Sequence, residues 1–177
     1  MYTMYLFKRS LPVLALGVIA GSAHAGLGDI LISDGGDVSV VVSKYTGNPG
    51  FDNLLGVAAP VNTFVGHNND WQGTPTPVDL GVIAAGTEVE LYLTNPFNET
   101  FYTGPAGRNP DGMIHANVNA LTAGVYTVDF EDATDFDYGD GRLIISGVHA
   151  LPTPEPTTMA FLGIGVLAVL KRRARRA

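Results

Sequence analysis

The sequence predicts an all-β fold, an antiparallel β-sandwich of the jelly-roll type, although a β-barrel is also compatible with the same pattern. Three observations predict it. Short segments alternate apolar and polar residues with period two, turn-forming residues separate these segments, and helical periodicity never exceeds two turns outside the two ends of the chain. Cysteine is absent, so a domain of this size depends on its core or on bound ions rather than on disulfides.

Four segments alternate most clearly and are predicted to be strands: 37–44, 87–94, 125–131 and 142–148. In the last of them, Leu143 and Ile145 are expected on one face and Ile144 and Val148 on the other. Weaker strand candidates are residues 62–66, 80–84 and 113–119. Turn signals rich in Gly, Pro, Asn and Asp lie between them, which gives seven or eight short strands.

The formal net charge of −7 conceals an uneven distribution. The predicted domain, residues 26–150, contains three basic residues, Lys44, Arg108 and Arg142, against sixteen acidic ones, which is a formal charge of −13. Such a domain repels nucleic acid, and it repels anionic lipid or polysaccharide unless cations bridge the two. We therefore expect no nucleic-acid partner.

Acidic residues crowd into one predicted hairpin loop, at positions 129, 131, 132, 135, 137 and 140. Two like charges about 5 Å apart repel by roughly 0.8 kcal/mol in water, so the loop resists closure unless a cation neutralises it. Ca²⁺ accepts about six to eight oxygen ligands in irregular geometry. We therefore predict a calcium site with these candidate ligands: Glu131, Asp132, Asp135, Asp137 and Asp140.

The alternative is that these side chains cap turns through hydrogen bonds to the backbone and otherwise face water. The spacing is not that of an EF-hand, because the third acid comes one residue late and Ser146 stands where the last glutamate would be. Metal binding and turn capping both remain open from the residues alone.

The N-terminal segment, residues 1–25, has the features of a secretory signal peptide. Two basic residues precede the apolar run 11–20, and Ala23 and Ala25 form a small-x-small cleavage site. The mature chain is expected to begin at Gly26. An uncleaved membrane helix is the less favoured alternative, because the apolar run is short.

The C-terminal segment, residues 151–177, combines three features in a fixed order. It begins with the triplet Pro154, Glu155 and Pro156, and an apolar run over 159–170 follows. The chain closes with five basic residues: Lys171, Arg172, Arg173, Arg175 and Arg176. This arrangement resembles the PEP-CTERM sorting signal of bacterial exported proteins. The resemblance implies recognition by an exosortase-type membrane protease.

The apolar run is marginal as a membrane anchor. Its 12 residues form a helix of roughly 18 Å against a hydrocarbon core of about 30 Å. The basic end would hold it on the cytoplasmic side of the inner membrane. We expect a transmembrane helix held briefly in the inner membrane of a Gram-negative bacterium, followed by cleavage and release to the cell surface or extracellular matrix. A permanent anchor is the alternative.

A second resemblance covers most of residues 30–149. The stretch Phe130-Glu131-Asp132, followed by Asp135-Phe136-Asp137-Tyr138-Gly139-Asp140, is similar to the F-E-D…D-x-D-[YF]-N-D ending of an uncharacterised β-rich domain of PEP-CTERM and cyanobacterial exported proteins. Upstream, residues 104–116 are similar to that family's G-P-x-x-R-N-P-D-G…H-A stretch. Gly139 departs from the family's Asn and removes one side-chain oxygen. The resemblance implies fold and context but no reaction.

Three further residues are candidates for specific contacts. His115, close in sequence to Asn109 and Asp111, either joins the acidic site or, more commonly, is an ordinary hydrogen-bonding residue. Arg108 is expected to pair with a carboxylate of the acidic loop, and a contact to an anion or a sugar is the less favoured alternative. Trp71 either stacks on a sugar or, more commonly, packs at the edge of the core.

The chain has none of the motifs of nucleophilic, zinc-dependent or phosphate-binding catalysis, so we expect no enzyme activity. We expect a structural or adhesive protein of the extracellular polysaccharide matrix, such as a biofilm, with a calcium-stabilised loop. The alternatives are a carbohydrate-binding module that uses Trp71 and, less favoured, a hydrolase that uses Asp135 and Asp137.

Overall fold

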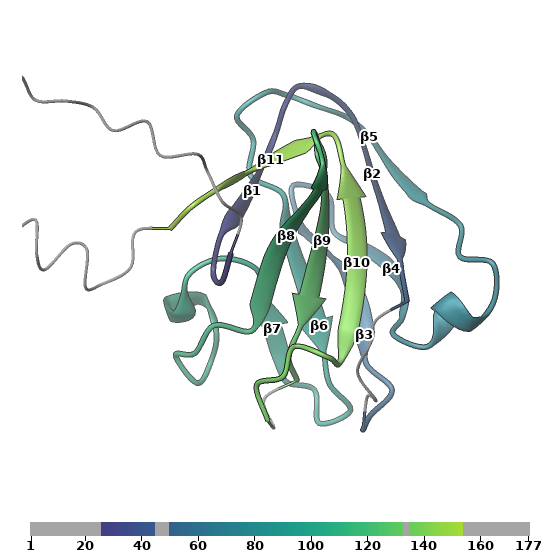
Figure 1. The fold of residues 1–177 in the computed structure, drawn as a ribbon, viewed down its shortest axis with the longest axis vertical. Coiled ribbons are helices and arrows are strands. Elements are labelled where there is room, and N and C mark those ends of the chain that lie inside the picture. The colour runs from purple at the N-terminus through teal and green to yellow at the C-terminus, as the bar shows by residue number, and fades with distance from the viewer. Residues whose placement is uncertain (1–25, 45–49, 133–134, 154–177) are drawn as a thin grey trace, which may run out of the picture.

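The computed structural model describes residues 26–44, 50–132 and 135–153, which form a two-layer antiparallel β-sandwich with a small two-stranded sheet beside it (Figure 1). The predicted antiparallel sandwich is therefore confirmed. The predicted signal peptide, residues 1–25, and residues 154–177 of the predicted sorting segment lie outside the described residues. Within the described ranges no helix is long and apolar enough to cross a membrane, and the expected anchor at 159–170 lies outside them.

Eleven strands and two single-turn 3₁₀ helices occur in the described residues. The strands are β1 (Ile30–Ser33), β2 (Gly36–Val42), β3 (Leu54–Ala59), β4 (Thr63–His67), β5 (Val78–Ile83), β6 (Glu90–Thr94), β7 (Thr100–Tyr102), β8 (Ala116–Thr122), β9 (Val125–Phe130), β10 (Gly141–Ser146) and β11 (Val148–Leu151). The 3₁₀ helices are η1 (Asp70–Gln72) and η2 (Ala106–Arg108).

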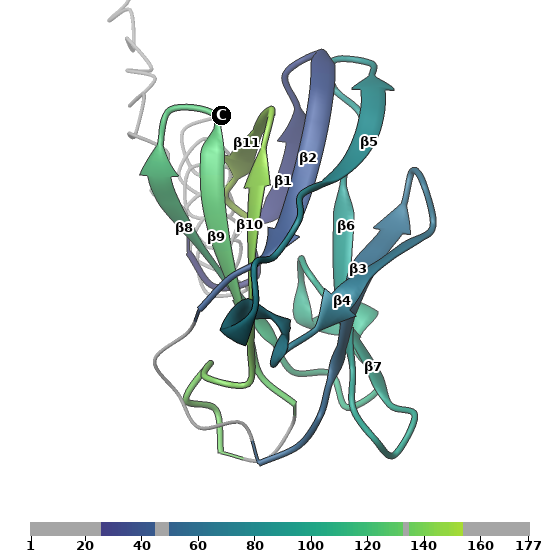
Figure 2. The same cartoon turned by 90° about the vertical axis from the view of Figure 1, so that its right-hand side faces the viewer.

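The two layers have the strand orders β5-β2-β10-β9-β8 and β4-β3-β6-β7, and β1 pairs with β11 in the small sheet. Figure 2 shows the layers from the side, with β8, β9 and β10 in one and β3, β4 and β6 in the other. All pairs of strands are antiparallel. In the described residues neither layer closes on itself: β5 and β8 end one layer, β4 and β7 end the other, and β8 carries only an isolated bridge to Leu27 beyond its pairing with β9. The structure is therefore a sandwich and not a closed barrel.

The core lies between the layers and follows the period-two patterns of the sequence. Val38 and Val40 of β2, and Leu91 and Leu93 of β6, have no solvent-exposed surface. Burying a side chain of this size stabilises the fold by about 1.5–3 kcal/mol relative to leaving it exposed. Since the domain has no disulfide, this core carries most of its stability.

The seven predicted strands are all present with shifted ends, but four strands were not predicted: β1, β3, β7 and β11. Strand β7 has only three residues, which is too short for a periodic signal. In β3, three consecutive residues, Leu55, Gly56 and Val57, are buried, so no alternation is visible. Gly56 is buried because the ring of Tyr92 lies over it.

The strand predicted over 142–148 ends earlier than expected, at Ser146. The strand breaks at Gly147, whose φ of +82° favours glycine, and Val148 begins β11, where it is fully buried. Val148 therefore does not share a face with the half-buried Ile144. A side chain at position 147 would overlap the carbonyl oxygen of Asp37, which is a second reason for glycine.

One end of the sandwich gathers several loops. The β9–β10 loop contains the acidic residues, and the β6–β7 loop and the segment before β3 reach the same end (Figure 1). The rings of Phe51 and Phe97 meet there edge to face, with centroids 5.3 Å apart. The fold thus places the acidic loop among loops from both layers.

The break between β10 and β11 at Gly147 gives a testable prediction. Gly147→Ala should lower the free energy of unfolding by roughly 3 kcal/mol, because it combines left-handed strain with an overlap against Asp37. Gly86→Ala is the matched control, since Gly86 has the same φ of +82° and open space where a Cβ would lie. It should cost only about 1 kcal/mol. Urea unfolding measures both, and equal effects would contradict the role given to the overlap.

Candidate metal centre

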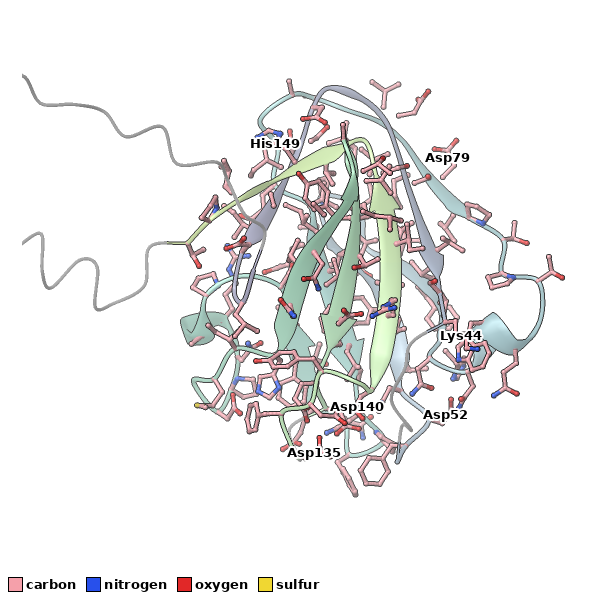
Figure 3. All side chains as sticks on the ribbon, viewed as in Figure 1. Lys44, Asp52, Asp79, Asp135, Asp140 and His149 are labelled. Carbon is pink, nitrogen blue, oxygen red and sulfur yellow. The ribbon has the colours of Figure 1, made fainter. Side chains whose placement is uncertain are left out.

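Four carboxylates of the β9–β10 loop converge on one point. Glu131 directly follows β9 and Asp140 directly precedes β10, while Asp135 and Asp137 lie between them. One carboxylate oxygen from each residue lies within 4.8 Å of those of the other three. Figure 3 shows Asp135 and Asp140 close together at this end of the sandwich. This cluster could hold a metal ion.

The cluster has a buried half and an exposed half. Glu131 is fully buried and Asp140 is 6% exposed, whereas Asp135 and Asp137 are exposed. A cation from solvent can therefore reach two outer ligands and be held by two inner ones. Oxygen-only ligands of high negative charge are those that Ca²⁺ and Mg²⁺ prefer, and irregular loop geometry suits Ca²⁺ better.

Backbone hydrogen bonds hold the loop in this shape. The N–H groups of Asp135 and Tyr138 donate to the two oxygens of Glu131, each at 3.3 Å. The N–H of Gly139 donates to Asp137 at 2.7 Å, so turn capping, the alternative stated above, is also present. A carboxylate offers about four acceptor positions, so capping and cation binding are compatible.

Two residues of the loop adopt a backbone conformation that side chains disfavour. Phe136 and Tyr138 have φ values of +58° and +56°. The Tyr138 hydroxyl donates to the carbonyl of Ile114 at 3.0 Å, which helps to hold the turn in place. Such strain persists where the surrounding structure over-determines the loop, and here it turns successive carboxylates towards one point.

Burial, and after it the neighbouring negative charges, raises the pKa of Asp140. Burial raises the pKa of Asp140 to about 7, against a hydrogen bond from the Asp132 N–H that lowers it. The negative charges of Asp132 and Glu131, and then of Asp137, raise it further. A bound cation would favour the ionised carboxylate and offset this penalty.

The basic residues of the described chain lie elsewhere. Arg108 was expected to pair with the acidic loop, and this was wrong: it pairs with Glu88 and with Glu90, the latter at 3.1 Å. Arg108 lies in η2, within reach of Glu90 in β6 and of Glu88 two residues before it. Arg142 pairs with Asp129, which removes that acid from the cluster. Neither arginine therefore pairs with the four converging carboxylates.

Asp132, a predicted ligand, is not among the four converging residues. It is buried, and its carboxylate accepts a hydrogen bond from the Asn53 amide at 3.2 Å. Asn68 donates to the carbonyl of Asp140 at 2.8 Å, and Asn95 donates to the carbonyl of Asp132 at 3.4 Å. These three asparagines support the loop from other loops, and no signal in the sequence pointed to them.

His115 is a buried hydrogen-bonding residue that supports the acidic loop from beneath. Its Nδ1 lies 3.1 Å from the carbonyl oxygen of Glu131, and its Nε2 lies 2.8 Å from Asp111. Its ring stacks on Phe101 with centroids 4.0 Å apart. The imidazole is not one of the four converging groups, but it links the turn before β8 to the residue that begins the cluster.

Trp71 packs at the edge of the core. It lies in η1, half-buried against the hydrophobic core, and the Lys44 ammonium lies over its ring at 5.4 Å from the centroid. A sugar stacks on an open ring face, and Lys44 lies over a face of this ring while the residue packs against the core. The packing interpretation of Trp71 is favoured over sugar stacking.

Comparison with known proteins identifies the C-terminal segment. Residues 152–176 match the family model of the PEP-CTERM protein-sorting motif. No curated protein matches the chain. The match implies an exported protein that an exosortase-type protease processes at the membrane. The predicted motif Pro154, Glu155 and Pro156 and the five basic residues from Lys171 to Arg176 fall inside the matched range, and all of them lie outside the described residues.

The raised pKa of Asp140 gives a pH prediction for the metal-free protein. The folded state holds the Asp140 proton more tightly than the unfolded chain, whose pKa is near 3.8, so this contribution to stability is complete below about pH 4. It should be lost as the pH rises towards 7. Unfolding in chelator should therefore show falling stability over this window, and Asp140→Asn should flatten the profile. An unchanged profile in the variant would contradict the assignment.

Proposed function

We propose that this chain is a non-enzymatic structural or adhesive protein, exported behind the signal peptide 1–25 and delivered by its PEP-CTERM segment to the surface or extracellular polysaccharide matrix of a Gram-negative cell. Calcium stabilises its acidic loop. The observation that carries the proposal is the pairing of a sorting motif at 152–176 with a compact acidic sandwich whose four carboxylates converge.

Export and sorting give the domain access to calcium. Outside the cell Ca²⁺ reaches concentrations that suit sites of modest affinity, with dissociation constants of about 10⁻⁴ to 10⁻³ M. The cluster of Glu131, Asp135, Asp137 and Asp140 supports such a site, since two ligands are exposed and the loop is strained. A cation held there also provides a bridge to anionic polysaccharide, which the formal charge of −13 would otherwise repel.

The other two functions have less support. A carbohydrate site at Trp71 is disfavoured because the ring packs against the core and lies under Lys44. A hydrolase would need one acid of raised pKa and one ionised acid around a substrate. Asp135 and Asp137 are both exposed and both accept backbone hydrogen bonds within their own loop, which is the pattern of a structural turn.

Calcium should stabilise the protein measurably. If the dissociation constant is 10- to 100-fold below the calcium concentration, binding contributes about 1.4–2.7 kcal/mol, which is a rise of several degrees in Tm. The double variant Asp135→Asn with Asp137→Asn should lose this rise, because it removes both exposed ligands. Differential scanning calorimetry with Ca²⁺ and with chelator measures the difference.

A matched control removes the same charge elsewhere. Asp37→Asn with Asp79→Asn changes two exposed carboxylates outside the cluster, and Asp79 lies at the opposite end of the sandwich from Asp135 (Figure 3). This variant should keep the full calcium effect. Identical melting curves with calcium and with chelator for the unaltered protein would remove the calcium site from the proposal.

Processing at both ends is a separate prediction. The mature protein should begin at Gly26 and end near Pro156, and deletion of the sorting protease should leave a chain that retains its C-terminal residues and stays with the inner membrane. Mass spectrometry of both termini, from cells with and without the protease, tests this. A mature protein that still ends at Ala177 in wild-type cells would rule out release by cleavage.

A further inference from the structure

The outer face of the β4-β3-β6-β7 sheet carries a row of aromatic residues that runs across all four strands. The strand register places Phe64 of β4 opposite Gly56 of β3, Gly56 opposite Tyr92 of β6, and Tyr92 opposite Tyr102 of β7. Directly opposed residues point to the same face of a sheet. With neighbouring strands about 4.8 Å apart, the row extends over roughly 14 Å.

This aromatic row does not belong to the core. Its members alternate with Leu91, Leu93 and Phe101, which are buried between the two layers, so the row faces the opposite way. Phe64 is 53% exposed, and Tyr92 and Tyr102 are half-buried. In Figure 2 no other described element covers this side of the sheet. Folding alone therefore does not account for three aromatic rings at these positions.

Gly56 has no side chain, and the Tyr92 ring occupies the space that one would fill. A Cβ at this position would overlap the Cζ, Oη and Cε1 atoms of Tyr92, so the phenol ring lies across the backbone of β3. The absence of a side chain at Gly56 thus lets the ring lie low on the sheet. Burial raises the pKa of Tyr92, and Tyr102 contributes to the rise, which places the two phenols near each other.

Hydroxyl and amide groups flank the aromatic row. Thr94 and Thr100 form the next pair of opposed residues on the same face of β6 and β7, and their hydroxyl oxygens lie 2.9 Å apart. A depression of about 240 Å³ runs between Asn62 and Tyr102. A second depression, of about 610 Å³, continues past Tyr102 towards Asn98. The two adjoin at Thr100 and Tyr102, and together they form a shallow groove over β6 and β7.

The charges along the groove exclude an anionic occupant. Glu99 lines the larger depression, and Glu90 lies on β6 two residues from Tyr92. Arg108, the basic residue that lines the groove, is already paired with Glu88 and Glu90. An anionic chain would find no uncompensated positive charge among the residues that line this groove.

We propose that this groove, together with the aromatic row that continues from it, binds a neutral polysaccharide chain. The rings of Tyr92 and Tyr102 in the groove, and of Phe64 at the β4 end of the row, lie against the apolar faces of hexose units, and the threonine hydroxyls and asparagine amides bond to sugar hydroxyls. Rings that offer an apolar face beside a few polar groups suit such a ligand. A strip that crosses the sheet from edge to edge suits an extended chain better than a single small molecule.

This site differs from both glycan contacts considered above. It does not use Trp71, and it does not use calcium, because none of the four converging carboxylates lines the groove. Binding of neutral polysaccharide should therefore persist in chelator. Failure of the calcium site and failure of this groove are accordingly separate results.

The test is affinity electrophoresis of the exported protein in gels that contain a soluble neutral β-glucan, a neutral galactomannan or, for comparison, the anionic polysaccharide alginate, all in chelator. At least one neutral polysaccharide should retard the protein. Tyr92→Ala and Tyr102→Ala should each weaken binding about two- to tenfold, as the loss of one aromatic contact predicts. Phe97→Ala is the control, since Phe97 is 66% exposed but lies outside the groove, and it should bind normally.

A second variant tests the geometry without deleting a ring. Gly56→Ala should displace the Tyr92 ring and weaken binding to a similar degree, while the melting temperature stays close to that of the unaltered protein, because the ring is the free end of a side chain. Several results would overturn the proposal. They are no retardation by either neutral polysaccharide, retardation by alginate alone, and tyrosine variants that bind as strongly as the unaltered protein. A dimer in sedimentation that the same substitutions abolish would also overturn it, because the row would then be a contact between two copies of the chain.

Discussion

The constraint on which this structure depends is electrostatic. A domain with a formal charge of −13 buries Glu131, Asp132 and Asp140 at one end of a sandwich, where ionised carboxylates are costly. Burial raises the pKa of Asp140, in keeping with that cost. The hydrophobic core between the layers must hold this end together, since the chain has no disulfide to do so. A cation bound at the loop would offset part of that cost.

The fold meets this constraint by surrounding the loop with neutral donors. Asn53, Asn68 and Asn95 come from three different loops and donate to the carboxylate and backbone oxygens of the segment. His115 fixes the same segment from inside the sandwich. Amides compensate buried oxygens without adding charge, so they stabilise the closed loop while leaving the outer carboxylates available to solvent ions. Rigid support of this kind is what a site on a loop requires.

The sandwich presents two separate candidate binding surfaces. The acidic loop occupies an end, where strands finish and loops gather, whereas the aromatic row occupies a flat outer face, where strand register sets the spacing. In the proposed function, these two surfaces would make two weak contacts of different chemistry, and the second contact would form at high effective concentration. The sorting segment at 152–176 provides the delivery, and the sandwich provides the surfaces.

The sequence by itself determined the β class, the acidic loop and the sorting segment, because each depends on residues close together in the chain. The alternation that predicted a strand over 37–44 is a local property of the chain, and Val38 and Val40 of that segment are fully buried. Only the tertiary structure decided that Arg108 pairs away from the loop, that Asn53 supports it, and that Phe64 and Tyr102 lie in one row. Those contacts join residues far apart in the sequence, and the pairing and register of the strands, which no local pattern encodes, bring them together.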